Sequence, residues 1–178
     1  MKIYKTKIKG VFKIKTLKFR DHRGFFSEIY NHNSFKRIFP NNFVQDNLSF
    51  NKKKFTFRGF HFQSSPFEQS KLIRVEKGEI IDFVIDLRKF SKTYLKMIKV
   101  KMSKKNLVQL YIPKGCAHGF LTLKPNTTVF YKVDNYYSKI NERGYNILDK
   151  KITLKGFNKK NFIMSKKDRK LPLLYEKN

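Results

Sequence analysis

Apolar and polar residues alternate with a period of two along most of the chain. The segment GVFKIKTLKF (10–19) alternates apolar and basic side chains, as a strand with one buried face does. Two further runs, 71–76 and 79–87, are rich in Ile, Val and Leu and are separated by Lys77-Gly78, a dipeptide typical of a hairpin turn. The pattern therefore predicts strands that are joined by tight turns.

The second half of the chain continues this pattern. Segments 96–103 and 106–113 are predicted to pair across Lys104-Lys105, and segments 119–123 and 128–137 are separated by a turn at Pro125-Asn126. Short helices are expected near 33–39 and in the tail after about 165. Many short antiparallel strands are typical of a sandwich or barrel, a class that includes jelly rolls. We therefore predict one all-β domain over residues 1–178.

The composition agrees with a single globular domain. The chain has 178 residues of which 40% are hydrophobic, enough for a core. It has no apolar run of about 18 residues, the length that a membrane-spanning helix requires, and the N-terminal segment has no continuous apolar region typical of a signal peptide. The single cysteine, Cys116, cannot form an internal disulfide. These features predict a cytoplasmic protein.

The net charge of +28 raises nucleic acid as a partner, because 41 basic residues face only 13 acidic ones. Only eight of the basic residues are Arg, however, and the Lys residues are spread along the whole chain. Abundant Phe, Ile, Asn and Lys together are typical of an A/T-rich coding sequence. We therefore favour a solvated lysine surface that attracts small anions over a surface for nucleic acid or membrane.

Two of the four histidines are candidates for chemistry. His61 lies in FRGFHFQ and His118 in YIPKGCAHGF, and each is flanked by apolar strands and by Gly or polar residues. One such histidine is more often a hydrogen-bonded core residue, but two favour a shared pocket. The spacing Pro-x-Gly-x-x-His resembles the second half of the cupin metal signature. Its first half needs His-x-His, but the corresponding residues here are His61-Phe62-Gln63, so one metal ligand is missing. Glu68 compensates for the missing ligand only in part, and we therefore predict no metal.

Several other polar residues are candidates for binding an anionic substrate. Arg suits phosphate because its guanidinium donates two parallel hydrogen bonds. In a regular strand Arg58 would lie on the face opposite His61, unless a bulge at Gly59 turns it. For Arg23, a surface ion pair with Asp21 or Glu28 remains equally open. The candidates from these segments are Arg23, Glu28, Gln45, Asn47 and Arg58, of which Gln45 and Asn47 alternate on one strand face.

Three further residues carry groups suited to proton transfer or to charge stabilisation. Lys71 begins the strand that follows the His61 segment. Tyr131 alternates in phase with two valines and should face inward, where a phenol needs a hydrogen-bond partner or donates a proton. Asp168 lies in a basic tail, and spacing alone connects it to no other candidate.

Taken in order, seven motifs cover nearly the whole chain. They are FRDHRGFFSEIY, FVQDN, RGFHFQ, QSKLIRVEKGEIIDFVIDLR, PKGCAHGF, YKVDNYY and SKKD. Together they resemble the dTDP-4-dehydrorhamnose 3,5-epimerase family of dTDP-L-rhamnose synthesis. The resemblance implies a cupin-type β jelly roll with short flanking helices, a homodimer, no metal and no cofactor.

The resemblance also implies a role for each candidate. His61 corresponds to the catalytic base and Asp168 to the carboxylate that orients it, while Tyr131 corresponds to a general acid on the opposite face of the sugar. Lys71 and His118 correspond to residues near the sugar carbonyl, with Asp82 supporting them. The residues that correspond to the nucleotide diphosphate site are Arg23, Glu28, Gln45, Asn47 and Arg58, and Tyr137 corresponds to an aromatic near sugar and nucleotide.

The sequence departs from the family pattern at three positions. Phe60 and Phe62 stand where Leu and Tyr are more usual, and Cys116 often reads Phe. The expected substrate is a dTDP-linked 4-keto-6-deoxy sugar, in which the carbonyl acidifies the protons on C3 and C5. Alternatives are an epimerase of one carbon or of another nucleotide-linked keto sugar, a non-catalytic sugar-nucleotide or nucleic-acid binding module, and a metal-dependent cupin.

Overall fold

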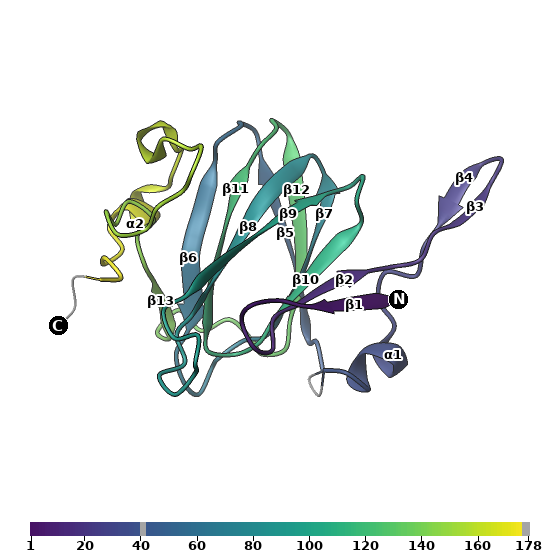
Figure 1. The fold of residues 1–178 in the computed structure, drawn as a ribbon, viewed down its shortest axis with the longest axis horizontal. Coiled ribbons are helices and arrows are strands. Elements are labelled where there is room, and N and C mark those ends of the chain that lie inside the picture. Colours follow the sequence, from purple (N-terminus) through teal and green to yellow (C-terminus); the bar gives the residue numbers. More distant parts are fainter. Residues whose placement is uncertain (40–41, 176–178) are drawn as a thin grey trace.

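The computed structural model describes residues 1–39 and 42–175, and its main body consists of two antiparallel sheets packed face to face (Figure 1). The first sheet has the strand order β1-β2-β10-β7-β12-β5 and the second the order β13-β6-β11-β8-β9. The strands of the first sheet, in that order, are Lys2–Lys5, Phe12–Lys15, Val108–Ile112, Lys71–Lys77, Thr127–Val133 and Gln45–Asn51. Those of the second are Glu142–Gly144, Phe57–Gln63, Cys116–Thr122, Glu79–Asp86 and Met97–Ser103.

The remaining elements lie outside the two main sheets. Strands β3 (Phe19–Asp21) and β4 (Gly24–Phe26) form a separate hairpin that extends away from the body (Figure 1). Helix α1 spans His32–Lys36, a 3₁₀ turn spans Lys159–Asn161, and helix α2 spans Lys166–Arg169 on the side of the body opposite the hairpin (Figure 1). The prediction of an all-β jelly roll with short flanking helices is confirmed.

The two predicted hairpins, at Lys77-Gly78 and Lys104-Lys105, are absent from the described residues, because the strands on either side of each turn belong to different sheets. The turn at Pro125-Asn126 connects the two sheets in the same way. β7 lies in the first sheet and β8 in the second, β9 in the second and β10 in the first, and β11 in the second and β12 in the first. A period-two pattern does not distinguish a hairpin from an arch, because both reverse the chain and keep the same side chains facing the core.

The turn at Gly78 illustrates such an arch. Its φ of +83° is rare for residues with a Cβ, and a Cβ at this position would lie 2.2 Å from the hydroxyl of Thr127. Glycine therefore suits the close approach of the β7–β8 turn to Thr127, the first residue of β12.

Two predicted strands are shorter than the pattern suggested. The strand over 10–19 divides into β2 and β3, because the chain leaves the sheet at Thr16, whose hydroxyl accepts a hydrogen bond from Ser27 at 3.0 Å. The strand over 128–137 ends at Val133, where the carboxylate of Asp134 accepts the backbone N–H of Ser70 at 2.5 Å.

Three apolar clusters stabilise this arrangement. The first fills the space between the sheets and includes Ile73, Val84 and Val129, all of them inaccessible to solvent. The second covers the outer face of the five-stranded sheet, where Phe57 stacks on Phe162 of the C-terminal segment with ring centroids 5.9 Å apart. The third packs α1 against the outer face of the six-stranded sheet. Since β11 is covered on both faces, all of its residues are buried.

Candidate active site

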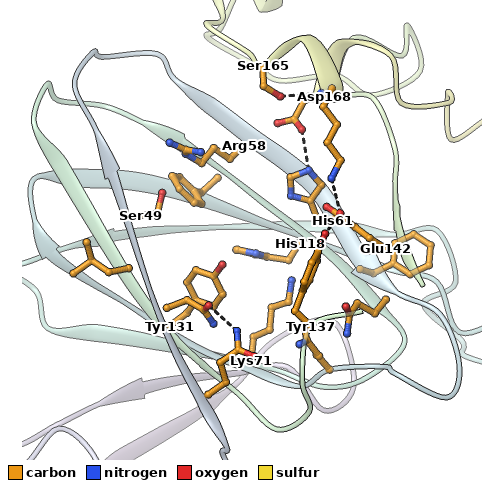
Figure 2. A pocket seen from close by; sticks show the side chains of 18 of the residues that line it. Ser49, Arg58, His61, Lys71, His118, Tyr131, Tyr137, Glu142, Ser165 and Asp168 are labelled. Carbon is orange, nitrogen blue, oxygen red and sulfur yellow. Dashed lines mark hydrogen bonds and ion pairs between the residues drawn. The ribbon is translucent and has the colours of Figure 1, made fainter. Parts of the chain in front are cut away.

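A cavity of about 530 Å³ opens between the two sheets (Figure 2). Strands β5, β7 and β12 line one wall, strands β6, β11 and β13 line the other, and α2 contributes to the rim. The candidates that line this cavity are Gln45, Asn47, Arg58, His61, Lys71, His118, Tyr131, Tyr137 and Asp168. The structure therefore brings nine of the eleven candidate residues to one place.

His61 and Asp168 are in direct contact, although 107 positions separate them in the chain (Figure 2). The Nε2 atom of His61 lies 2.9 Å from Oδ1 of Asp168, and Oδ2 of the same carboxylate accepts the N–H of Gly59 at 3.2 Å. Burial acts to raise the pKa of Asp168, but the hydrogen bonds from His61 and Gly59 and the charge of His61 hold it below its ordinary value. The carboxylate thus stays ionised and fixes the orientation of the ring.

Asp168 is presented by helix α2, which begins with a capping interaction. The hydroxyl of Ser165 accepts the backbone N–H of Asp168 at 3.0 Å, so the side chain three residues after the cap is held at the first turn. The Asp168 side chain is only 6% exposed. The pattern Ser-x-x-Asp therefore caps helix α2 and holds Asp168 in its first turn. The distance between Asp168 and His61 along the sequence gave no indication of this role.

A second group of ionisable side chains lies deeper in the pocket. The Nε2 atom of His118 lies 2.8 Å from Oδ2 of Asp82, and both residues are buried. Among the described residues, Oδ1 of Asp82 has no hydrogen-bond partner. Burial lowers the pKa of Lys71 to about 8, although the charges of Asp82 and Glu142 act to raise it. Burial likewise lowers the pKa of His118, so Lys71 is the cationic group of this cluster at neutral pH.

Tyr131 faces His118 and Asp82 from the opposite sheet, which also carries Lys71. It lies on β12, directly opposite Asn47 of β5 in the sheet register, and its ring packs on the core between the sheets. Burial raises the pKa of its phenol, so the hydroxyl remains protonated and can donate. His61 lies on β6 in the facing sheet, and the pocket separates the two side chains (Figure 2).

An irregularity in β6 brings Arg58 and His61 to the same pocket. The register between β11 and β6 shifts between His118 and Phe120. Gly59 has a φ of +118°, and a Cβ on it would lie 2.6 Å from the carbonyl oxygen of His118. As a result Arg58 and His61 both line the cavity. The structure therefore supports a bulge at Gly59 over a regular strand.

The polar residues near the pocket mouth have partners within the chain. Gln45 donates to Asn47 at 2.8 Å, and the two residues face the pocket from alternate positions on β5. The Nε atom of Arg58 donates to the side chain of Asn51 at 2.7 Å. Tyr137 is 55% exposed, and its hydroxyl donates to Glu142 at 2.7 Å. These groups form a polar rim around the ionisable interior.

Arg23 and Glu28 do not line the pocket of this chain. Arg23 lies in the turn between β3 and β4, where its Nη2 atom is 2.6 Å from Asp21, and Glu28 accepts a hydrogen bond from Asn31 at 3.1 Å. The surface ion pair that the sequence left open for Arg23 is therefore present within the single chain.

Sequence reasoning missed two charged residues of the pocket. Glu142 comes from β13 and Lys167 from α2, and they form an ion pair of 2.5 Å (Figure 2). Lys167 directly precedes the candidate Asp168 in SKKD, and this proximity could have identified it as a pocket residue. No motif in the sequence around Glu142 indicated that it lies at the site.

Within residues 1–39 and 42–175, no group of three or more His, Cys, Asp or Glu side chains lies close enough together to hold a metal ion. In the same part of the chain, no helix is long and apolar enough to cross a membrane.

The jelly roll and its similarity to solved epimerase structures place the chain among the cupin-type epimerases of nucleotide-linked sugars. The chain belongs to the dTDP-4-dehydrorhamnose 3,5-epimerase family, whose model matches residues 5–176.

Individual relatives agree with this assignment over almost the entire length of the chain. The dTDP-4-dehydrorhamnose 3,5-epimerase of Escherichia coli is 38% identical over 178 residues, which cover 99% of this chain and 96% of the relative. The crystal structure of the Bacillus anthracis enzyme with TDP and PPi bound is 42% identical, has a TM-score of 0.93, and covers 97% of this chain and 99% of its own. The Legionella pneumophila epimerase in complex with dTDP-4-keto-L-rhamnose is 33% identical, with a TM-score of 0.89 and coverages of 97% and 92%.

Proposed function

We propose that this chain inverts C3 and C5 of dTDP-4-keto-6-deoxy-glucose in dTDP-L-rhamnose synthesis, and that residues 1–178 act as a single epimerase domain in the cytoplasm. The observation that carries the proposal is the His61–Asp168 pair on one wall of the pocket, with Tyr131 on the other. The membership of the chain in the 3,5-epimerase family supports both the reaction and the sugar nucleotide.

The first chemical step is removal of a proton from the carbon next to the ketone. Neutral His61 accepts the proton, and the electron pair of the C–H bond moves towards the C4 carbonyl to give an enolate. The carboxylate of Asp168, 2.9 Å from the ring, stabilises the imidazolium that forms. His61 is suited to this role because its ring is held by the carboxylate yet lines the open cavity.

The negative charge that develops on the enolate oxygen is stabilised by a nearby cation. The ammonium of Lys71 is this cation, with the His118–Asp82 pair beside it. Because burial lowers the pKa of Lys71 to about 8, the side chain is mostly protonated at neutral pH and loses its proton as the pH rises through about 8.

Inversion is completed when a proton returns to the same carbon from the opposite face. Tyr131 is the donor, since its phenol is protonated and lies on the facing sheet. The resulting phenolate and imidazolium return to their starting states by proton exchange with solvent, and the same pair then acts on the second carbon.

The nucleotide is proposed to bind along the polar rim. Arg58 offers a guanidinium to the diphosphate, and Gln45, Asn47 and Tyr137 line the adjoining surface. In a single chain Arg23 is distant from this rim, in the turn of the β3–β4 hairpin.

A homodimer would bring the hairpin of a second chain to the pocket. The hairpin exposes Phe19, Phe25 and Phe26, whose exposed fractions are 59%, 46% and 69%. The hairpin extends away from the body (Figure 1), and its exposed rings form an apolar surface that a second chain can cover. Arg23 and Glu28 of the partner chain would then complete the nucleotide site. Sedimentation analysis checks the assembly: Phe26→Asp should yield monomers with a weaker affinity for dTDP.

The function is tested by incubating the protein with dTDP-4-keto-6-deoxy-glucose in D₂O. Deuterium should appear at C3 and C5, and NMR of the product should show both centres inverted. Deuterium and inversion at one carbon only would identify a mono-epimerase, and activity on a different nucleotide carrier alone would identify another substrate. Absence of exchange by folded protein with every carrier would contradict the catalytic assignment.

A further inference from the structure

Glu142 lies in the pocket but has no part in the proton transfers proposed above. It belongs to β13, the edge strand that pairs with β6, where it lies opposite Gln63 and two residues before the partner of His61. Its side chain is 18% exposed. Burial acts to raise the pKa of its carboxyl, but the hydrogen bonds from Lys167 and Tyr137 hold it below its ordinary value. Glu142 is therefore an anion at the wall of the site.

The carboxylate of Glu142 joins three segments that are far apart in the sequence. One oxygen, Oε2, accepts the hydroxyl of Tyr137 at 2.7 Å and the ammonium of Lys167 at 2.5 Å (Figure 2). Tyr137 lies in the loop after β12, and Lys167 lies in α2. A single oxygen thus connects an edge strand, a pocket loop and the helix that presents the orienting carboxylate.

Helix α2 is only four residues long, so its position depends on such contacts. Asp168 bonds to His61 and to the N–H of Gly59, and the side chain of Asn146 donates to the carbonyl of Arg169 at 2.8 Å. The pair between Lys167 and Glu142 adds a charge-assisted contact one residue from Asp168. It therefore opposes any movement of α2 away from β6.

The charge of Glu142 also reaches the reacting groups. It acts to raise the pKa of Lys71 and that of Tyr131. Lys71 faces Asp82 on β8 and His118 on β11 as well, and burial is the largest influence on it. Loss of the Glu142 charge would therefore leave Asp82 as the remaining anion that favours the Lys71 ammonium.

We propose that Glu142 is a positioning residue of the epimerase, which holds α2 and Tyr137 against the pocket and so keeps Asp168 and His61 in their reactive arrangement. The inference rests on the proposed function, because its effect is measured on that reaction. The charge of Glu142 also favours the ammonium of Lys71, the cation that faces the enolate.

The test is Glu142→Gln, which keeps the size of the side chain and removes its charge. We expect kcat to fall about ten- to a hundredfold, the range that a displaced catalytic group produces. KM should change by less than about threefold, because the diphosphate contacts remain. The matched control is Glu79→Gln, since Glu79 pairs with Lys101 at 3.1 Å and does not line the pocket. The control should retain the wild-type kcat.

Two further variants separate position from charge. Lys167→Met removes only the ion pair and should lower kcat to a similar extent, and the double variant should be little worse than either single one. Glu142→Asp keeps the charge but shortens the reach, so kcat should fall while the alkaline limb of the pH–rate profile stays in place. In Glu142→Gln that limb should move to lower pH, because Lys71 loses a favourable charge.

The outcomes are distinguishable. Wild-type kcat and an unmoved alkaline limb in Glu142→Gln, with the wild type active, would overturn this inference and leave the proposed function intact. An inactive wild type would instead refute the proposed function. If Glu142→Gln lowers the melting temperature, Lys167→Met decides, and wild-type kcat in that variant would overturn the positioning role.

Discussion

Replacement of Asp168 by Asn tests the most informative contact of the site. The change keeps the shape of the side chain but removes the negative charge 2.9 Å from Nε2 of His61. A hydrogen bond to a charged group contributes about 1.5–3 kcal/mol. At about 1.4 kcal/mol for each factor of ten, the upper value corresponds to a rate loss of about a hundredfold. The loss should fall on kcat, because the imidazolium exists only after proton abstraction.

The assay is the rate at which solvent deuterium enters C3 and C5 in a single turnover. Both rates should fall together in Asp168→Asn, since one base serves both carbons in the proposed reaction. The matched control is Asp46→Asn, which removes a surface ion pair with Lys132 at 2.8 Å outside the pocket and should change the rate less than about twofold. Exchange rates for Asp168→Asn within about threefold of wild type would refute the role of the carboxylate.

Three further predictions address the acid, the cation and the bulge. Tyr131→Phe should retain exchange of the substrate protons with solvent to a greater extent than inversion, and undiminished inversion in the NMR assay would contradict its role as the acid. Activity should decline as the pH rises through about 8, because Lys71 then loses its proton, and in Lys71→Met the residual rate should lack this step. Gly59→Ala should lower the free energy of unfolding by more than about 1 kcal/mol in urea titrations, because its Cβ would meet the carbonyl of His118. An unchanged urea midpoint would show that the bulge accommodates a side chain.

The alternating pattern predicted the strands far better than their partners. The segments around Gly78 and Asn126 were recognised as turns, yet each connects two sheets rather than two paired strands. Local periodicity reports which side chains face the core, whereas pairing depends on segments distant in the chain. The all-β class was therefore predictable from local residues, but the strand order was not.

The candidate site was predictable to a different degree at each residue. The inward orientation of Tyr131 followed from its phase with the neighbouring valines, and the pocket confirms it. Asp168 was linked to His61 only through the family resemblance, because 107 positions lie between them. Glu142 had neither a motif nor a periodic position to mark it. Its place at the site follows from the pairing of β13 with β6, which only the folded chain reveals.

The arches between the sheets have a consequence for how the protein folds. Consecutive strands such as β7 and β8 lie in different sheets, so each pairs with a strand that is distant in the sequence. Strand β5, for example, pairs with β12. Contacts between distant segments require large loops to close first, which slows folding to about milliseconds or seconds. Neither half of the sequence contains all the strands of either main sheet. We therefore expect catalytic activity to return late in refolding, after the two sheets have packed together and the pocket between them has formed.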